Sequence, residues 1–272
     1  MQIIDAHAHI FSKPTLKQSE EEILVSMKKY GIAFSLISNC DAAEFSSGAT
    51  DKVKNTTTLK CLNQVLTFVK KSPKKLGAAV WIRPVKEKGP SPELNECVKR
   101  NRMLIYALKY HPYCERTPIS SPLLEPWLAW AEEENFPIIV HTAEDEYSDV
   151  DFLVEVAKKH PKLKFVAAHV QLCSDNSKGF AAISSTKNIY GDTAWVPMKV
   201  AAKILRQVGP DRIMFGTDNP IDGVDTLANP MYQDYFSNRS RLSRTLFENL
   251  MRNNAISFFQ LPLTPNQAPI LK

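Results

Sequence analysis

Eight short apolar runs, rich in β-branched and aromatic residues, recur along the chain at intervals of roughly 25 to 45 residues. Each run has the length of one buried strand, and the spacing leaves room for a helix and two loops before the next run. In order they read QIIDAHAH, IAFSLISNC, LGAAVWIR, MLIYALKY, FPIIVHT, KLKFVAAHV, NIYGDT and DRIMFGTD. The pattern predicts eight parallel strands.

The segments between these runs carry helix signals. In SEEEILVSMKKYG, Ser19 is the predicted N-cap, Glu22 completes a capping box and Gly31 is the predicted C-cap. SPELNECVKRN and SPLLEPWLAWAEEEN place proline directly after a capping serine, where a helix accepts it. Three- and four-residue apolar spacing marks further helices in DVDFLVEVAKKHP, VPMKVAAKILRQVGP and SRTLFENLMRNNAISFF. A strand followed by a helix therefore repeats through the whole chain.

An α/β pattern of this length fits either an open doubly wound sheet or a closed barrel. The first strand is not followed by the glycine-rich fingerprint of a dinucleotide-binding sheet. Instead, polar residues follow nearly every strand: His7, His9, Asn39, Arg83, Lys109, His111, His141, His169, Asp192 and Asp218. In a barrel these ends converge on one face, so we predict a single (β/α)8 TIM barrel over residues 1–259 and an extended tail over 260–272.

Composition narrows the class of protein. The chain has 272 residues, 44% of them hydrophobic, and a scattered net charge of +5 that is too mild to indicate nucleic-acid binding. Its five cysteines contain no C-x-x-C pair, and strand-like residues begin almost at Met1 without a basic leader. We therefore expect a cytoplasmic protein with a small-molecule substrate and no nucleic-acid or membrane partner. The sequence leaves a homodimer open.

The histidines carry the candidate chemistry. His7 and His9 are two apart on one strand, so their side chains share a face, on which Asp5 is also expected. All the other histidines except His160 also lie at or just past a predicted strand end. Neutral imidazoles and a carboxylate suit a zinc-like ion, and His7, His9, His141 and Asp218 would supply three nitrogens and an oxygen. His169 is then a candidate general base or acid.

The motifs D-x-H-x-H, IIVHT, FVAAHV and RIMFGTDNP together resemble the amidohydrolase superfamily. LKYHPY, GPDRIMFGTDNP and NLMRNNAISFF are most similar to its amidohydrolase 2 branch, which includes aminocarboxymuconate-semialdehyde decarboxylase, and the resemblance runs from Ile3 to about Phe259. It implies a metal-dependent barrel enzyme in which His7, His9, His141 and Asp218 hold one ion, most simply zinc with manganese as the alternative. It also implies that His169 activates the metal-bound water. Relatives with two metals use a carboxylated lysine, so a bridge at Lys109 stays open, although LKYHP resembles the one-metal branch.

Other strand-end residues have weaker cases. Arg83, Lys109 and His111 are candidates for binding a substrate carboxylate, while Arg83 could equally form a salt bridge to a loop acid. Asp218 is both a candidate ligand and a catalytic residue, or it caps the turn before Pro220. The aromatic residues Trp195, Tyr113 and Tyr232 either wall an apolar pocket or pack between helices.

Four functions fit these residues to different degrees. The first is a hydrolase that cleaves an ester, lactone or amide of a small carboxylate-bearing substrate with a metal-activated water. The alternative is a non-oxidative decarboxylase with the same metal site. A TatD-type deoxyribonuclease is less favoured, because those enzymes carry a glutamate on the fourth strand where this chain has Lys109. A catalytically silent binding barrel is less favoured because none of the expected ligands is missing. Specificity is expected from the segments 41–55 and 219–240.

Overall fold

The computed structural model describes residues 2–12, 14–45, 56–221 and 225–264. Within these ranges eight strands form one sheet in which all seven neighbouring pairs are parallel and the order follows the sequence. The strands are β1 (Ile3–Ile10), β2 (Ile32–Asn39), β3 (Leu76–Trp81), β4 (Ile105–Tyr110), β5 (Ile138–Ala143), β6 (Phe165–Leu172), β7 (Ile189–Asp192) and β8 (Ile213–Met214). The segment after β8 returns to β1, where the backbone N–H of Ala6 donates to Phe215 O and that of His9 donates to Asn219 O. The sheet therefore closes into the predicted (β/α)8 barrel.

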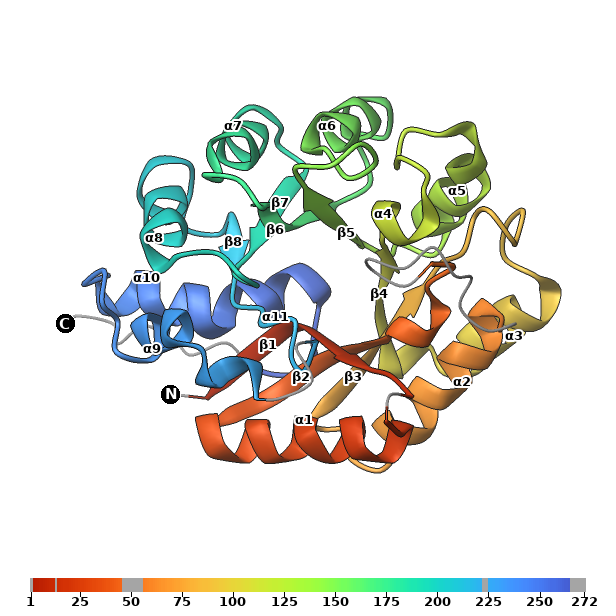
Figure 1. Cartoon of the computed structure of the whole chain (residues 1–272), viewed down its shortest axis with the longest axis horizontal. Helices are drawn as coiled ribbons and strands as arrows, with labels where there is room; N and C mark the ends of the chain where they lie inside the picture. Colours follow the sequence, from red (N-terminus) through yellow and green to blue (C-terminus); the bar gives the residue numbers. More distant parts are fainter. Residues whose placement is uncertain (1, 13, 46–55, 222–224, 265–272) are drawn as a thin grey trace.

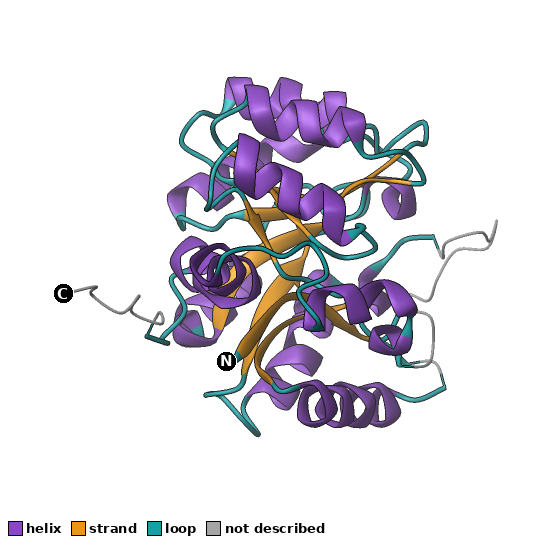
Figure 2. Ribbon diagram, turned by 90° about the vertical axis from the view of Figure 1, so that its left-hand side faces the viewer, coloured by secondary structure: helices purple, strands orange, loops and turns teal. Residues whose placement is uncertain are grey.

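Helices surround the barrel on its outside (Figure 1, Figure 2). They are α1 (Leu16–Tyr30), α2 (Thr58–Val69), α3 (Pro92–Arg100), α4 (Pro112–Glu115), α5 (Glu125–Glu133), α6 (Val150–Lys159), α7 (Ser177–Ser185), α8 (Met198–Gln207), α9 (Pro230–Phe236), α10 (Arg244–Glu248) and α11 (Asn254–Phe259). A short π-helical segment, Asn249–Asn253, joins α10 to α11. No helix in the described ranges is long and apolar enough to cross a membrane.

The helix-capping predictions were partly right. Gly31 ends α1 with φ 69°, as predicted, and the Ser91 side chain caps α3 by accepting from Leu94 N. The N-cap of α1 is Thr15 and not Ser19, because the helix begins one turn earlier. Ser19 lies inside the helix, where its hydroxyl donates to Phe11 O and accepts from Phe11 N. It therefore fastens the loop after β1 to α1.

Two apolar layers hold the barrel together. The outer layer lies between strands and helices, and includes Ile37 of β2 and Leu66 of α2. The inner layer fills the amino-terminal half of the barrel, where strand residues such as Ile4, Phe34 and Ile139 pack against Ile256 and Phe259 of α11. The C-terminal helix therefore closes the bottom of the barrel and leaves its interior polar only at the other end.

The first strand changes face in the middle. Its register with β2 shifts between Asp5 and Ala8. Ile4 and Ala6 belong to the inner layer, whereas Ala8 belongs to the outer layer. The expectation that Asp5 shares a face with the two histidines was therefore wrong. Asp5 instead accepts hydrogen bonds from the hydroxyl and the backbone N–H of Thr217 and from His7 N, and so fixes the irregular backbone.

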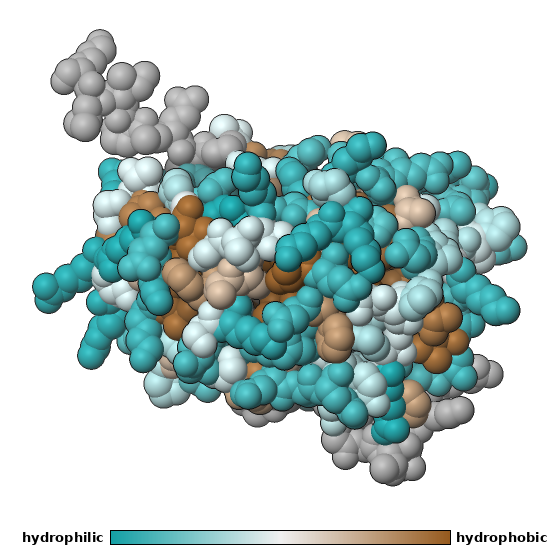
Figure 3. Space-filling model, turned by 90° about the horizontal axis from the view of Figure 1, so that it is seen from above, coloured by the Kyte–Doolittle hydropathy of each residue, from teal (hydrophilic) through white to brown (hydrophobic). Residues whose placement is uncertain are grey.

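Several predictions fall partly outside the described residues. Of the tail predicted over 260–272, only residues 260–264 are described; Leu261 is buried against the inner layer, and Arg252 donates to Thr264 O. Residues 46–55 and 222–224 of the predicted specificity segments also lie outside them. The face drawn in Figure 3 is largely hydrophilic, with hydrophobic side chains in small separate areas. The homodimer and the cytoplasmic location remain predictions.

Candidate metal centre

A cavity of about 440 Å³ opens at the carboxyl end of the barrel. Its polar lining comes from several strand ends and includes His9, Lys109, His111, His141, His169 and Asp218. Its apolar wall consists of Phe11, Ala43, Trp81, Leu172, Trp195 and Ile221. Six of the ten strand-end residues predicted to converge thus line one space, whereas His7, Asn39, Arg83 and Asp192 do not line it.

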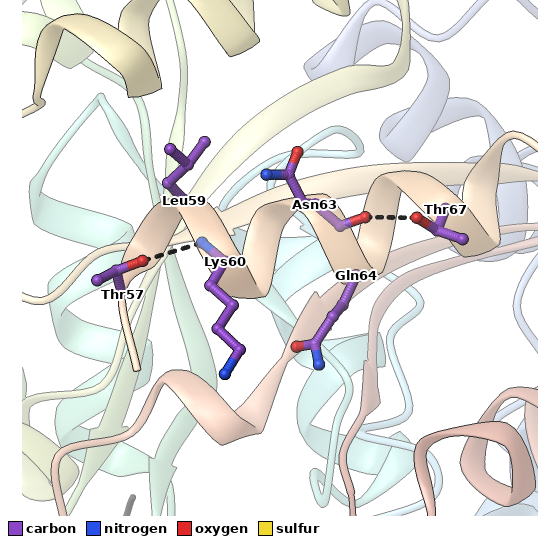
Figure 4. A pocket seen from close by; sticks show the side chains of 6 residues that line it. All are labelled: Thr57, Leu59, Lys60, Asn63, Gln64 and Thr67. Atoms are coloured by element: carbon purple, nitrogen blue, oxygen red, sulfur yellow. Dashed lines mark hydrogen bonds between the residues drawn. The ribbon is translucent and has the colours of Figure 1, made fainter. Parts of the chain in front are cut away.

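A second depression of similar size lies on the outer face of α2 (Figure 4). Thr57, Leu59, Lys60, Asn63, Gln64 and Thr67 line it. Thr57 caps the helix by accepting from Lys60 N, and the Thr67 hydroxyl donates to Asn63 O. Gln64 Oε1 accepts from Asn39 Nδ2 at the end of β2. Nothing among these side chains offers acid, base or metal-ligand chemistry beyond one lysine, so this depression is not the candidate site.

His9 and Asp218 form the floor of the cavity, and His7 contacts both of them. The Nε2 atoms of the two histidines are 3.1 Å apart, and Asp218 Oδ1 lies 2.8 Å from His9 Nε2 and 3.3 Å from His7 Nε2. His7, His169 and Asp218 each offer one ligand atom within 4.8 Å of the others. All four side chains are buried. The arrangement gathers three imidazoles and one carboxylate around a common point.

Asp192 orients two of these histidines. Its Oδ2 accepts from His7 Nδ1 at 2.9 Å, and its Oδ1 accepts from the backbone N–H groups of His169 and Ala194. Because a carboxylate accepts here, Nδ1 of His7 carries the proton and Nε2 keeps its lone pair. His169 has the same tautomer, because its Nδ1 lies 3.1 Å from Ala194 O, which can only accept. Both rings therefore present an unprotonated Nε2.

Burial keeps these rings neutral. Desolvation, helped by nearby Lys109, holds the pKa of His7 well below its usual range, and desolvation lowers the pKa of His169 to about 4. Burial by itself would raise the pKa of Asp218, but His169 and the hydrogen bond from His9 outweigh it and hold that pKa well below its usual range. The site thus combines neutral imidazoles with an ionised carboxylate, which is the donor set that a zinc or manganese ion binds.

Lys109 lies directly beside this donor set. Its Nζ donates to His7 Nε2 at 2.7 Å, and the side chain is fully buried. Desolvation lowers the pKa of Lys109. It is the only lysine or arginine among the described residues that line the cavity. An ion that takes His7 Nε2 would displace this hydrogen bond and free the amine for another acceptor.

His111 and His141 form a stack instead of joining the floor. Their ring centroids are 3.8 Å apart with an interplanar angle of 13°, and the Trp81 ring also stacks with His111, with centroids 5.7 Å apart. His111 Nδ1 accepts from Cys114 N, so its neutral ring carries the proton on Nε2. His141 lies beside His169, with ring centroids 4.8 Å apart. Its predicted role as a metal ligand stays a prediction.

The candidates with weaker support from the sequence differ in whether they line the cavity. Arg83 does not line the cavity: its guanidinium forms a buried salt bridge with Glu44 at 2.8 Å and donates to Thr56 O. This is the loop-acid alternative that the sequence left open. Tyr232 is buried between Phe215 and Tyr235, and Tyr113 is exposed. Trp195 does wall the cavity.

Three residues act in the site in ways the sequence did not predict. Trp195 Nε1 donates to Asp218 Oδ2 at 3.0 Å, and Ser38 Oγ lies 2.8 Å from His9 Nδ1. The sequence identified Asp192 as a polar residue at a strand end. Its hydrogen bonds to His7 and His169 could not be predicted, because they form only when the barrel places β7 beside β6 and near β1. Ser38 gave no signal, because one serine in a strand is common.

Comparisons with known proteins agree with this architecture. A family model described as amidohydrolase matches residues 4–261. No curated protein matches the chain by sequence. Among solved structures, a 5-carboxyvanillate decarboxylase from Novosphingobium aromaticivorans, complexed with manganese and 4-hydroxy-3-methoxy-5-nitrobenzoic acid, is 12% identical, with 96% of each chain covered and a TM-score of 0.69.

Two further structures have the same fold. A 2,6-dihydroxybenzoate decarboxylase complexed with 2,6-dihydroxybenzoate is 14% identical, covering 96% of this chain and 100% of that one, with a TM-score of 0.66. A probable 2-pyrone-4,6-dicarboxylic acid hydrolase from Acinetobacter baumannii with bound citric acid is 13% identical, with the same coverage and a TM-score of 0.65. At these identities the likeness shows the fold alone. From the family match over residues 4–261, the chain belongs to the amidohydrolase family of metal-dependent enzymes.

Proposed function

We propose that this chain is a metal-dependent, non-oxidative decarboxylase of a small aromatic carboxylate. The observation that carries the proposal is the shape and chemistry of one cavity. Flat apolar walls from Trp81, Trp195 and Phe11 enclose a floor of histidines and Asp218, with Lys109 beside it. An aromatic ring fits between such walls, and a carboxylate is complementary to the buried amine.

His7, His9 and Asp218 are the residues that would hold the metal, with His141 as a further ligand. Their neutral nitrogens and ionised carboxylate suit one divalent ion, and a solved structure of similar fold is complexed with manganese. When bound, such an ion supplies a Lewis acid that orients and polarises substrate oxygens. Metal analysis of the purified protein distinguishes zinc from manganese.

Decarboxylation needs a proton at the ring carbon that loses carbon dioxide. The carbon–carboxylate bond breaks, its electron pair stays on the ring, and a proton takes its place. His169 and Asp218 are the groups that would take up this proton from water and pass it to the ring, because both line the cavity and lie together. A substrate carboxylate beside His169 would favour the protonated form of the imidazole and so raise its pKa above about 4.

Lys109 and His111 would bind the substrate's oxygen atoms. The Lys109 amine can donate to a carboxylate or a phenolate. His111 offers an Nε2–H donor, because its Nδ1 is occupied by Cys114 N. These two donors come from the same strand end and would fix the ring relative to His169.

Hydrolysis of a cyclic ester is the second candidate. A probable pyrone-dicarboxylic acid hydrolase shares the fold, and the neutral Nε2 of His169 could take a proton from an attacking water. The other two functions gain no support. A TatD-type deoxyribonuclease carries a glutamate on the fourth strand, where this chain has Lys109. The buried set of metal-ligating side chains argues against a barrel that binds a ligand without catalysis.

The test is a substrate panel with two readouts. Purified protein supplied with zinc or manganese is incubated with 2,6-dihydroxybenzoate, 5-carboxyvanillate and 2-pyrone-4,6-dicarboxylate, and both released carbon dioxide and ring-opened product are measured. His169→Gln serves as the inactive control, and His160→Gln as a matched histidine change outside the cavity. Carbon dioxide from an aromatic acid, lost only in His169→Gln, supports the proposal. Ring opening without carbon dioxide would replace it with the hydrolase.

A further inference from the structure

The chain around His169 has an unusual backbone. His169, Val170 and Gln171 are three consecutive residues with positive φ, at 70°, 49° and 69°. This left-handed region is costly for residues with a Cβ, above all for β-branched valine, and normally holds single residues. Surrounding contacts must therefore impose the conformation.

One buried side chain binds all three carbonyl groups of this segment. Asn176 Nδ2 lies 3.3 Å from His169 O, 2.9 Å from Val170 O and 3.4 Å from Gln171 O. Because carbonyl oxygens can only accept, the amide nitrogen of Asn176 must face them. The carboxamide therefore acts as a clamp on the three left-handed residues.

Other contacts hold the opposite side of the segment. Asp192 Oδ1 accepts from His169 N, and Thr142 Oγ1 accepts from Gln171 N. Helix α7 lies directly against the segment, because a Cβ on Gly179 would come within 2.5 Å of Val170 O. The N–H groups of His169 and Gln171 are thus held from β7 and β5, while Asn176 holds the carbonyl groups, with the Ser174 hydroxyl as a second donor to Gln171 O.

We infer that Asn176 is a positioning residue that aims the His169 imidazole through the main chain. The inference rests on the role proposed for His169, but not on which reaction the site performs. The clamp holds the His169 backbone where Nδ1 reaches Ala194 O at 3.1 Å, and that hydrogen bond leaves Nε2 unprotonated toward the cavity. Without the Asn176 clamp, the left-handed backbone relaxes, and His169 loses both its fixed orientation and its single tautomer.

The chain offers a matched control in Asn188. Its Nδ2 also contacts three carbonyl oxygens, Ala157 O at 3.0 Å, His160 O at 3.1 Å and Leu163 O at 2.9 Å. These carbonyls lie near the end of α6 and before β6, at the opposite end of the strands from the cavity. The change Asn188→Asp therefore removes an equivalent donor without touching the His169 segment.

The experiment reads the His169 tautomer directly by NMR. Full-length protein labelled with ¹⁵N-histidine and supplied with zinc, which is diamagnetic, gives imidazole correlations, and His169→Gln assigns the His169 signal. Asn176→Asp replaces the donor by an acceptor of the same shape. Asn176→Gly is the second variant, because glycine tolerates the φ of 64° at this position if the aspartate variant fails to fold.

We expect the His169 signal to lose its Nδ1-protonated pattern in both Asn176 variants and to keep it in Asn188→Asp. With a substrate in hand, kcat should fall about 10- to 100-fold in the Asn176 variants while KM changes little, and this loss should vanish when His169 is already replaced. A folded Asn176 variant with an unchanged His169 signal would overturn the inference, even if its melting temperature falls. The NMR readout needs no turnover, so failure of the proposed reaction leaves it intact.

Discussion

The two ends of the barrel use the same strands for opposite purposes. At the amino end, Ile139 of β5 and Val166 of β6 pack against the apolar face of α11. At the carboxyl end, the same strands present His141 and His169 to the cavity. One end is an apolar plug, and the other is a buried polar cluster.

The difference lies in how strictly each end constrains its side chains. The apolar plug needs volume and shape, and neighbouring residues can adjust to a substitution. In the polar cluster, particular hydrogen-bond partners fix the tautomers of His7 and His169, and burial fixes their charge. We therefore expect changes at the amino end to cost stability, and changes at the carboxyl end to cost activity or metal affinity.

The largest expected effect is on activity. His169→Gln removes the proton-transfer group, and we expect kcat on a confirmed substrate to fall about 10²- to 10⁴-fold. The free energy of unfolding should change by only about 1 kcal/mol, because glutamine keeps a polar side chain at this buried position. Steady-state kinetics and urea unfolding measure the two quantities. A large loss of stability with normal kcat would contradict the division between the ends.

The reverse pattern is expected at the amino end. Phe34 is fully buried and meets Tyr106 edge-on, with ring centroids 5.9 Å apart. Phe34→Ala leaves a cavity and should lower the free energy of unfolding by about 3–5 kcal/mol. Bound metal per folded chain should stay at the wild-type value. Urea unfolding and metal analysis of the folded fraction check both points, and loss of metal at unchanged stability would refute the account.

A smaller effect is expected from the support of the metal ligands. Asp192→Asn keeps the shape but removes a carboxylate that accepts from His7 Nδ1. The His7 tautomer is then no longer fixed, and metal affinity should fall about 10- to 100-fold. Competition with a chromophoric chelator measures this affinity. The conservative Asp192→Glu variant tests for partial recovery, and an affinity equal to wild type in Asp192→Asn would exclude the orienting role.

Local signals in the sequence predicted much of this division. The strands follow apolar runs, and the polar side chains at their ends could be read one by one. The change of face in β1, the choice of Glu44 as the partner of Arg83 and the stacking of His141 on His111 were not predictable in this way. Each depends on residues far apart in sequence. The left-handed backbone at His169 is likewise imposed by β7 and by the loop before α7, and its own residues do not favour it.

The smallest effect concerns Glu115, which lies near the cavity but contacts none of the proposed metal ligands. Unlike the other changes expected at this end of the barrel, its replacement should alter stability. Burial raises the pKa of Glu115 to about 8, and among the described residues its Oε2 has no hydrogen-bond partner. In the unfolded chain it ionises near 4.5, so the folded state holds an extra proton between these values. The free energy of unfolding should therefore fall as pH rises from about 5 to 8, by about 1 kcal/mol per pH unit.

Glu115→Gln should remove this pH dependence, because the amide stays neutral. Unfolding free energies of both proteins at pH 5, 6, 7 and 8 provide the comparison. Parallel curves for wild type and variant would mean that Glu115 ionises normally in the folded chain.

The most direct test of the central claim is the metal content of the carboxyl-end cluster. Protein purified without chelator is analysed by inductively coupled plasma mass spectrometry beside the His7→Ala, His9→Ala double variant, with His160→Gln as the control. The account predicts about one zinc or manganese ion per chain in the wild type and the control, and almost none in the double variant. A wild type without metal even after reconstitution, or a double variant that retains it, would contradict the claim.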